Sequence, residues 1–151
     1  MDGFICEEPP SFPIIFTIEG KPVPLKRHRT TRTGHRYDPS AKDKEIFLGK
    51  ARDTGQMPEV ALDQPLCVDL TFGMPRAKSH YRTGRFAGQL KGGAPVHHVS
   101  VPDVDNLAKF VLDSLNTYMF VDDSRIVEIH CRKVYAEDRV GYTTMKVTPV
   151  V

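Results

Sequence analysis

One amphipathic segment constrains the fold of this chain more than any other feature. Within residues 105–116 the apolar side chains of Leu107, Phe110, Val111 and Leu115 recur at intervals of three and four residues, which predicts a helix with a single apolar stripe. Such a stripe has to be covered by another apolar surface. The chain has 151 residues, close to the roughly 100–150 residues of a typical domain. We therefore expect the helix and the surface that covers its stripe to belong to one hydrophobic core.

Four other segments have the composition of β-strands. Residues 14–19 are rich in β-branched and aromatic side chains, residues 66–74 alternate partly, and residues 125–135 alternate throughout, which predicts a half-buried strand. Residues 142–150 complete the set, and a second helix is predicted from about Ser40 to Arg52. The order of these elements predicts an α/β (α+β) fold, a single domain in which a mixed β-sheet is packed by two helices.

The termini and the composition are typical of a cytoplasmic protein. Residues 1–13 contain three prolines and predict a flexible N-terminal arm before a folded domain of residues 14–151. No apolar stretch approaches the roughly 20 residues of a membrane span, and no secretory signal precedes the domain, so we expect no membrane partner. Cys6, Cys67 and Cys131 are widely spaced, which argues against a disulfide framework and against a cysteine-based zinc site.

Charge is unevenly distributed, although the formal net charge is only +2. The loops expected at residues 21–39 and 76–102 are basic, whereas acidic residues gather between Asp103 and Glu128. Cations that hold phosphates and carboxylates that hold a metal ion are what a nuclease requires. Ordinary surface charge explains the same distribution equally well. The basic residues that we expect to contact DNA are Arg27, Arg29, Arg32, Arg36, Lys78, Arg82 and Arg85.

The acidic cluster has two parts, separated by the amphipathic helix. Asp103 and Asp105 stand where a loop meets the helix, and Asp122 and Asp123 follow the helix at the start of a strand. If the carboxylates converge, they form an oxygen-rich site for Mg²⁺. Lys109, one turn after Asp105, would then neutralise charge on the scissile phosphate. The sequence is compatible with the second pair returning to the first and with its lying at the far end of the helix.

Each of these residues also has an ordinary structural explanation. Asp103 or Asp105 is suited to capping the helix. Lys109 stands four residues from Asp105 and from Asp113, the spacing of surface ion pairs. The pair of aspartates before Ser124 is typical of a turn. On this interpretation the chain is a non-catalytic DNA-binding or structural protein.

Two linked motifs resemble a known family. Asp-Val-Asp-Asn-Leu-Ala-Lys at residues 103–109, followed by Val-Asp-Asp-Ser-Arg-Ile-Val at residues 121–127, is similar to the RusA family of Holliday junction resolvases. The resemblance implies a homodimeric, Mg²⁺-dependent endonuclease that makes paired symmetric nicks in four-way (Holliday) junctions during recombination and repair. By position it implies catalytic roles for Asp103, Asp105, Lys109 and Asp123, with the three aspartates and the neighbouring Asp122 as metal ligands. Val101 stands where relatives often carry a basic residue, so other branched DNA, such as flaps or forks, remains an alternative substrate.

Overall fold

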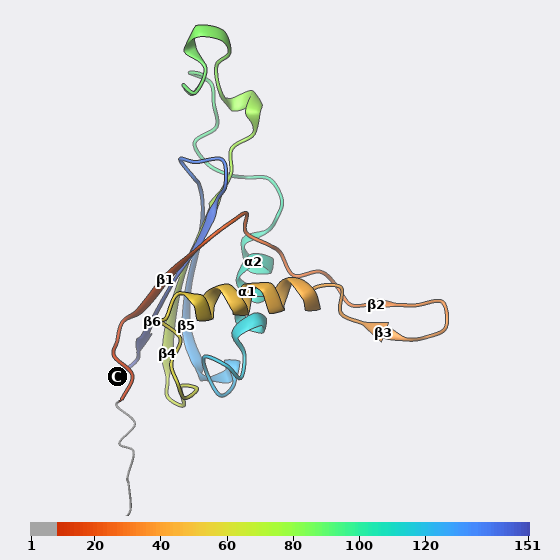
Figure 1. Cartoon of the computed structure of the whole chain (residues 1–151), viewed down its shortest axis with the longest axis vertical. Coiled ribbons are helices and arrows are strands. Elements are labelled where there is room, and N and C mark those ends of the chain that lie inside the picture. The colour runs from red at the N-terminus through yellow and green to blue at the C-terminus, as the bar shows by residue number, and fades with distance from the viewer. Residues whose placement is uncertain (1–8) are drawn as a thin grey trace, which may run out of the picture.

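A four-stranded mixed sheet forms the centre of the fold, with the strand order β1-β6-β4-β5 (Figure 1). Its strands are β1 (Ile14–Glu19), β4 (Leu66–Met74), β5 (Ile126–Tyr135) and β6 (Tyr142–Pro149). Strand β6 pairs antiparallel with β1 and β4, whereas β4 pairs parallel with β5. The edges of the sheet are therefore β1 and β5. This computed structural model, which describes residues 9–151, confirms the predicted mixed sheet.

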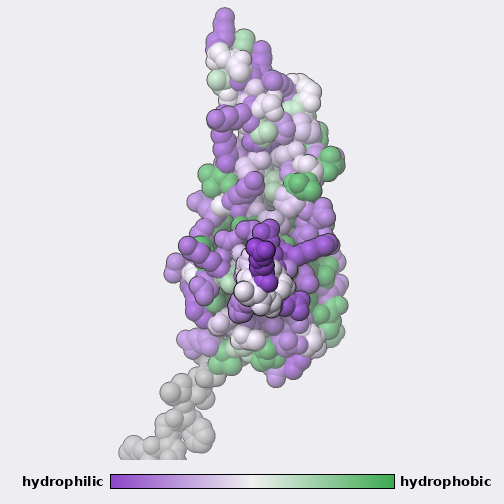
Figure 2. Space-filling model, turned by 90° about the vertical axis from the view of Figure 1, so that its right-hand side faces the viewer, coloured by the Kyte–Doolittle hydropathy of each residue, from purple (hydrophilic) through white to green (hydrophobic). Residues whose placement is uncertain are grey.

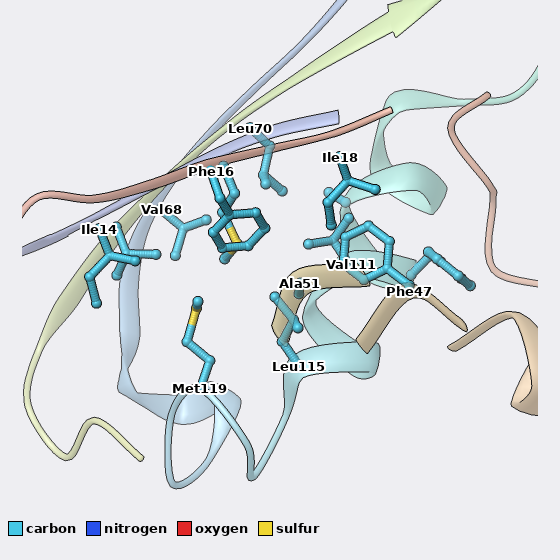
Figure 3. Packing of buried hydrophobic residues seen from close by; sticks show 14 of the residues in the cluster. Ile14, Phe16, Ile18, Phe47, Ala51, Val68, Leu70, Val111, Leu115 and Met119 are labelled. Atoms are coloured by element: carbon cyan, nitrogen blue, oxygen red, sulfur yellow. The ribbon is translucent and has the colours of Figure 1, made fainter. Parts of the chain in front are cut away.

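Two helices, α1 (Ala41–Asp53) and α2 (Val104–Leu115), pack on the same face of the sheet (Figure 1). All four residues of the predicted apolar stripe of α2 are buried, with exposed fractions of 1% or less. They join a core that includes side chains of β1, β4 and α1 (Figure 3). The rings of Phe47 and Phe110 meet edge to face at 5.7 Å and connect the two helices. Each buried Leu or Phe contributes about 1.5–3 kcal/mol, so tertiary packing holds α2 in place.

The segment predicted as a loop at residues 21–39 contains a short hairpin. Strands β2 (Arg29–Thr30) and β3 (Arg36–Tyr37) pair antiparallel, and Gly34 takes a positive φ of 85° in the connecting turn. The hairpin projects from the body beyond the start of α1, and residues 26–37 are exposed throughout (Figure 1). Strands of two residues are too short to produce an alternating pattern, which is why the sequence did not predict them.

The long loop at residues 76–102 forms a second projection, at the end of the molecule where β4 and β5 terminate (Figure 1). It contains two short 3₁₀ turns, Lys78–His80 and Gly84–Phe86. At its base the guanidinium of Arg76 donates to the carbonyl of Pro95 at 2.7 Å and lies 4.2 Å from the ring centre of Tyr135 in β5. The base of this loop is therefore fixed to the end of the sheet.

Strand β5 is less buried than its alternating sequence predicts. Val127 is 60% exposed and Ile129 43% exposed. Strand β5 is an edge strand, and the irregular pairing with β4 skips Val127. Residues 1–8 of the predicted N-terminal arm lie outside the described residues. None of the helices described within residues 9–151 has the length and apolar character to cross a membrane.

Candidate active site

The first pair of predicted carboxylates lies at the N-terminal end of α2. Asp103 occupies the N-cap position with an extended backbone, but its side chain makes no capping hydrogen bond. Asp105 lies in the first turn. Both side chains are exposed, and neither forms an ion pair within residues 9–151. Asp103 therefore stands at the N-cap without capping the helix, and both carboxylates have oxygens available for a ligand.

Lys109 is exposed on α2, one turn after Asp105, on the same side of the helix. Neither of the surface ion pairs that its spacing indicated is formed in the described part of the chain. Asp113 lies instead 3.9 Å from the ammonium group of Lys44 in α1. The ammonium group of Lys109 is therefore available to an anion bound beside Asp105.

Two contacts fix the backbone around this pair. The amide of Leu25 donates to the carbonyl of Asn106 at 3.2 Å and connects the base of the hairpin to the first turn of α2. The ammonium group of Lys133, near the end of β5, donates to the carbonyls of Ser100 and Pro102, both at 2.9 Å. Lys133 thus holds the backbone directly before the carboxylates. The sequence did not single out this residue, because it is the parallel pairing of β5 with β4 that brings it there.

The second pair, Asp122 and Asp123, lies at the opposite end of α2 (Figure 1). The helix ends at Leu115, a turn follows at Thr117, whose φ is 70°, and residues 118–121 then lead to the second pair. Twelve residues of helix span about 18 Å. Two oxygens bound to one Mg²⁺ lie at most about 4 Å apart. Within a single chain the two pairs therefore do not reach a common ion.

The two aspartates of the second pair differ in their surroundings. The carboxylate of Asp122 accepts a hydrogen bond from the amide of Ser124 at 3.2 Å, and hydrogen bonding to Ser124 holds the pKa of Asp122 below its ordinary value. This is the predicted turn. Asp123 is exposed, and its carboxylate has no hydrogen bond or ion pair among the described residues. Of the two, Asp123 has the carboxylate that is free for another partner.

The residues predicted to contact DNA lie on the two projections. The basic hairpin (residues 26–38) carries four exposed arginines that form no ion pair within the described chain, and Figure 2 shows its hydrophilic tip facing the viewer. The basic loop (residues 76–102) carries the rest, and there Arg82 and Arg85 lie 4.0 and 5.3 Å from the ring centre of Phe86. Both projections have their bases near the N-terminal end of α2. The four arginines of the hairpin are Arg27, Arg29, Arg32 and Arg36, and the loop adds Lys78.

One group of three potential metal ligands occurs within residues 9–151, and it is not the predicted aspartates. The ligand atoms of Cys67, Glu128 and His130 all lie within 4.8 Å of one another. These residues come from β4 and β5, away from the N-terminal end of α2. They are therefore distinct from the aspartates that the sequence motifs indicated.

Similarity to known proteins agrees with the motifs. Residues 19–145 match the model of the family described as Endodeoxyribonuclease RusA. The chain is also 33% identical over 129 residues to the Uncharacterized protein YqaN of Bacillus subtilis (strain 168), and this alignment covers 83% of the chain and 89% of the relative. The matched range of the family model includes both pairs of aspartates, Lys109 and the two basic projections.

Proposed function

Because this chain belongs to the endodeoxyribonuclease RusA family, we propose that it is a Mg²⁺-dependent, structure-selective endonuclease that makes paired symmetric nicks in Holliday junctions. The arrangement of side chains at the N-terminal end of α2 supports this proposal most directly. Two exposed carboxylates and an exposed lysine lie there, near the bases of two basic projections. Exposed arginines and lysines suit the phosphates of a DNA backbone, and carboxylates beside a lysine suit hydrolysis of one of them.

The residues at this end of α2 have separate tasks in the proposed reaction. Asp103 and Asp105 fit Mg²⁺, because this ion prefers oxygen ligands and both carboxylates lack a protein partner within residues 9–151. When bound, the ion supplies a Lewis acid and an activated water. Lys109 neutralises the charge that develops on the phosphate in the transition state. Lys133 is a positioning residue, since it binds the carbonyl of Pro102 next to Asp103.

From the position of Asp123 we infer a homodimer in which each active site contains residues of both chains. Strand β5 is an edge strand of ten residues, and its exposed Val127 and Ile129 are apolar. Long edge strands with exposed apolar side chains and unpaired backbone groups can pair with another strand. Antiparallel pairing of β5 with its copy places the start of one strand beside the end of the other.

This pairing unites the two halves of the acidic cluster. If the two-fold axis passes near Ile129, Asp123 lies opposite the partner's Tyr135, close to the partner's Lys133. Because Lys133 contacts the carbonyl of Pro102, Asp123 then approaches the partner's Asp103 and the partner's Asp105. A two-fold dimer has two such sites, which matches two symmetric nicks in a four-way junction.

Cleavage of defined substrates tests the proposal. Purified protein is expected to nick a four-way junction at two symmetric positions with Mg²⁺ but not with EDTA, and faster than it nicks flaps or forks. Asp105→Asn is expected to abolish cleavage while binding persists, since loss of a negative charge near phosphate does not weaken association. Asp113→Asn is the matched control on the same helix, outside the proposed site. Faster cleavage of flaps or forks would reject the junction as substrate, and cleavage by Asp105→Asn would reject the metal assignment.

A further inference from the structure

The face of the sheet opposite the helices carries a compact group of unlike ligands. Cys67 belongs to β4, and Glu128 and His130 belong to β5. Their ligand atoms lie within 4.8 Å of one another, and the Nε2 atom of His130 is 3.3 Å from a carboxylate oxygen of Glu128. The spacing of the cysteines argued against a cysteine-based zinc site. It is the pairing of β4 with β5 that brings a thiol, an imidazole and a carboxylate together.

A β-bulge places these three side chains on one face. In the register of β4 with β5, Leu66 pairs with Ile126 and Cys67 pairs with Glu128, so Val127 is skipped. Without this irregularity Cys67 would lie opposite Val127, which has no ligand atom. Side chains two residues apart on a strand share a face, so His130 lies on the same side as Glu128. Bulges are frequent beside functional sites, where they redirect a side chain.

Asp69, the neighbouring carboxylate on β4, is already bound by Arg132 and forms no hydrogen bond with the three ligands in the described chain. Asp69, which pairs with His130 in the register, accepts a bidentate contact from Arg132 at 2.9 and 3.2 Å. The side chains of His130 and Glu128 remain 55% and 54% exposed. In residues 9–151 their hydrogen bond is to each other. Within one chain, an ion arriving from solvent therefore meets three ligands whose side-chain hydrogen bond is the one between Glu128 and His130.

We propose that Cys67, Glu128 and His130 form a site for Zn²⁺ or a similar transition-metal ion, with a water molecule as the fourth ligand. Sulfur, nitrogen and oxygen atoms are the ligands of tetrahedral zinc, whose bonds of about 2.0–2.3 Å place neighbouring ligand atoms about 3.3–3.6 Å apart. The His130–Glu128 contact at 3.3 Å already satisfies this spacing. The remaining distances require shifts of at most about 1.5 Å, which side-chain rotation can supply.

The ligand set excludes Mg²⁺ as the preferred ion. A thiolate and an imidazole favour zinc-class ions, whereas Mg²⁺ takes oxygen ligands. Binding requires the Cys67 thiol to release its proton to solvent, and the bound ion then ties edge strand β5 to the central strand β4. This site uses none of the residues at the ends of α2, so its test does not require the proposed nuclease activity. In the proposed dimer, however, Glu128 and His130 lie on the strand that pairs with its copy.

Cobalt provides a spectroscopic test of the site. In the reduced protein, Co²⁺ is expected to produce a thiolate-to-cobalt charge-transfer absorption that saturates at one ion per chain. The band should be lost in Cys67→Ser. His130→Ala and Glu128→Gln change exposed side chains and should each weaken Co²⁺ binding by about tenfold or more. Excess Mg²⁺ should not displace the cobalt, whereas Zn²⁺ should.

The other cysteines provide a matched control. The double variant Cys6→Ser, Cys131→Ser retains Cys67 and should keep the full absorption; burial raises the pKa of the Cys131 thiol, which makes it a poor ligand. The circular dichroism spectrum of each variant establishes that it is folded. The proposal is overturned if the wild-type protein gives no charge-transfer band, if the band persists in Cys67→Ser, or if His130→Ala binds Co²⁺ as tightly as the wild type.

Discussion

Mixing two inactive variants tests whether each active site is shared between two chains. Asp105→Asn damages the carboxylates at the start of α2, and Asp123→Asn damages the carboxylate beyond its end. Each variant alone is expected to be inactive, because both sites of its homodimer lack one carboxylate. In a mixed dimer with shared sites, one active site contains both substituted residues and the other contains neither. The mixture is therefore expected to recover activity that neither variant has.

The separation of the two aspartates and the random mixing of chains together determine how much activity the mixture recovers. The helix from Asp105 to its end at Leu115 spans about 15 Å, which is far more than the 4 Å or so that one Mg²⁺ spans. Random exchange of chains makes half of the dimers mixed, and each mixed dimer has one intact site out of two. The mixture should thus contain roughly a quarter of the active sites of the wild-type protein.

The assay separates nicking from resolution. The two variants are unfolded and refolded together to exchange chains, then incubated with a labelled four-way junction and Mg²⁺. A denaturing gel should show single nicks at roughly a quarter of the wild-type yield. A native gel should show almost no resolved duplexes, because one intact site per dimer cuts only one of the two strands.

A matched mixture controls for refolding. When Asp103→Asn is refolded with Asp105→Asn, both defects lie in the same half of the site, so every site of every dimer is damaged. This mixture should stay inactive. If the mixture of Asp105→Asn and Asp123→Asn also stays inactive although mixed dimers are present, the shared site is refuted, and Asp123 has no role in completing the site of the partner.

Four further changes have defined outcomes. Lys109→Ala should reduce the cleavage rate much more than junction affinity, because its proposed task is in the transition state. Cleavage kinetics and a binding assay measure the two effects separately. Arg32→Ala should flatten the log–log dependence of junction affinity on salt by about 0.9, the effect of one lost phosphate contact; an unchanged slope would place DNA elsewhere. The hydrogen bond from Lys44, at 2.7 Å, lowers the pKa of Asp38 below its ordinary 3.8, so Asp38 stabilises the fold above that pH and loses this effect as the pH falls through the folded pKa. Urea unfolding should find Asp38→Asn less stable at pH 7 by about 1.5–3 kcal/mol, with the difference vanishing in acid. Phe110→Ala should cost about 3–5 kcal/mol in the same measurement, and a loss below 1 kcal/mol would contradict its burial.

Local patterns were enough to predict much of this protein. The apolar stripe of α2 and the strands of the sheet follow from periodicity within a few turns or residues of chain, and both were confirmed. The exposed start of α2, with Asp103, Asp105 and Lys109, was predictable for the same reason. A motif of seven residues at a helix N-terminus has its relative geometry determined by the helix itself.

Contacts between distant segments decided the rest. The sequence could not place Asp123 at the far end of α2, because the direction of β5 depends on its pairing with β4 and not on the residues between them. Nor could it indicate the group of Cys67, Glu128 and His130, which depends on one skipped residue in that pairing. Periodicity determines which face of an element is apolar, since burial acts on each segment by its own repeat. Only strand register and order determine which segments become neighbours, because a shift of one residue exchanges the two faces of a strand.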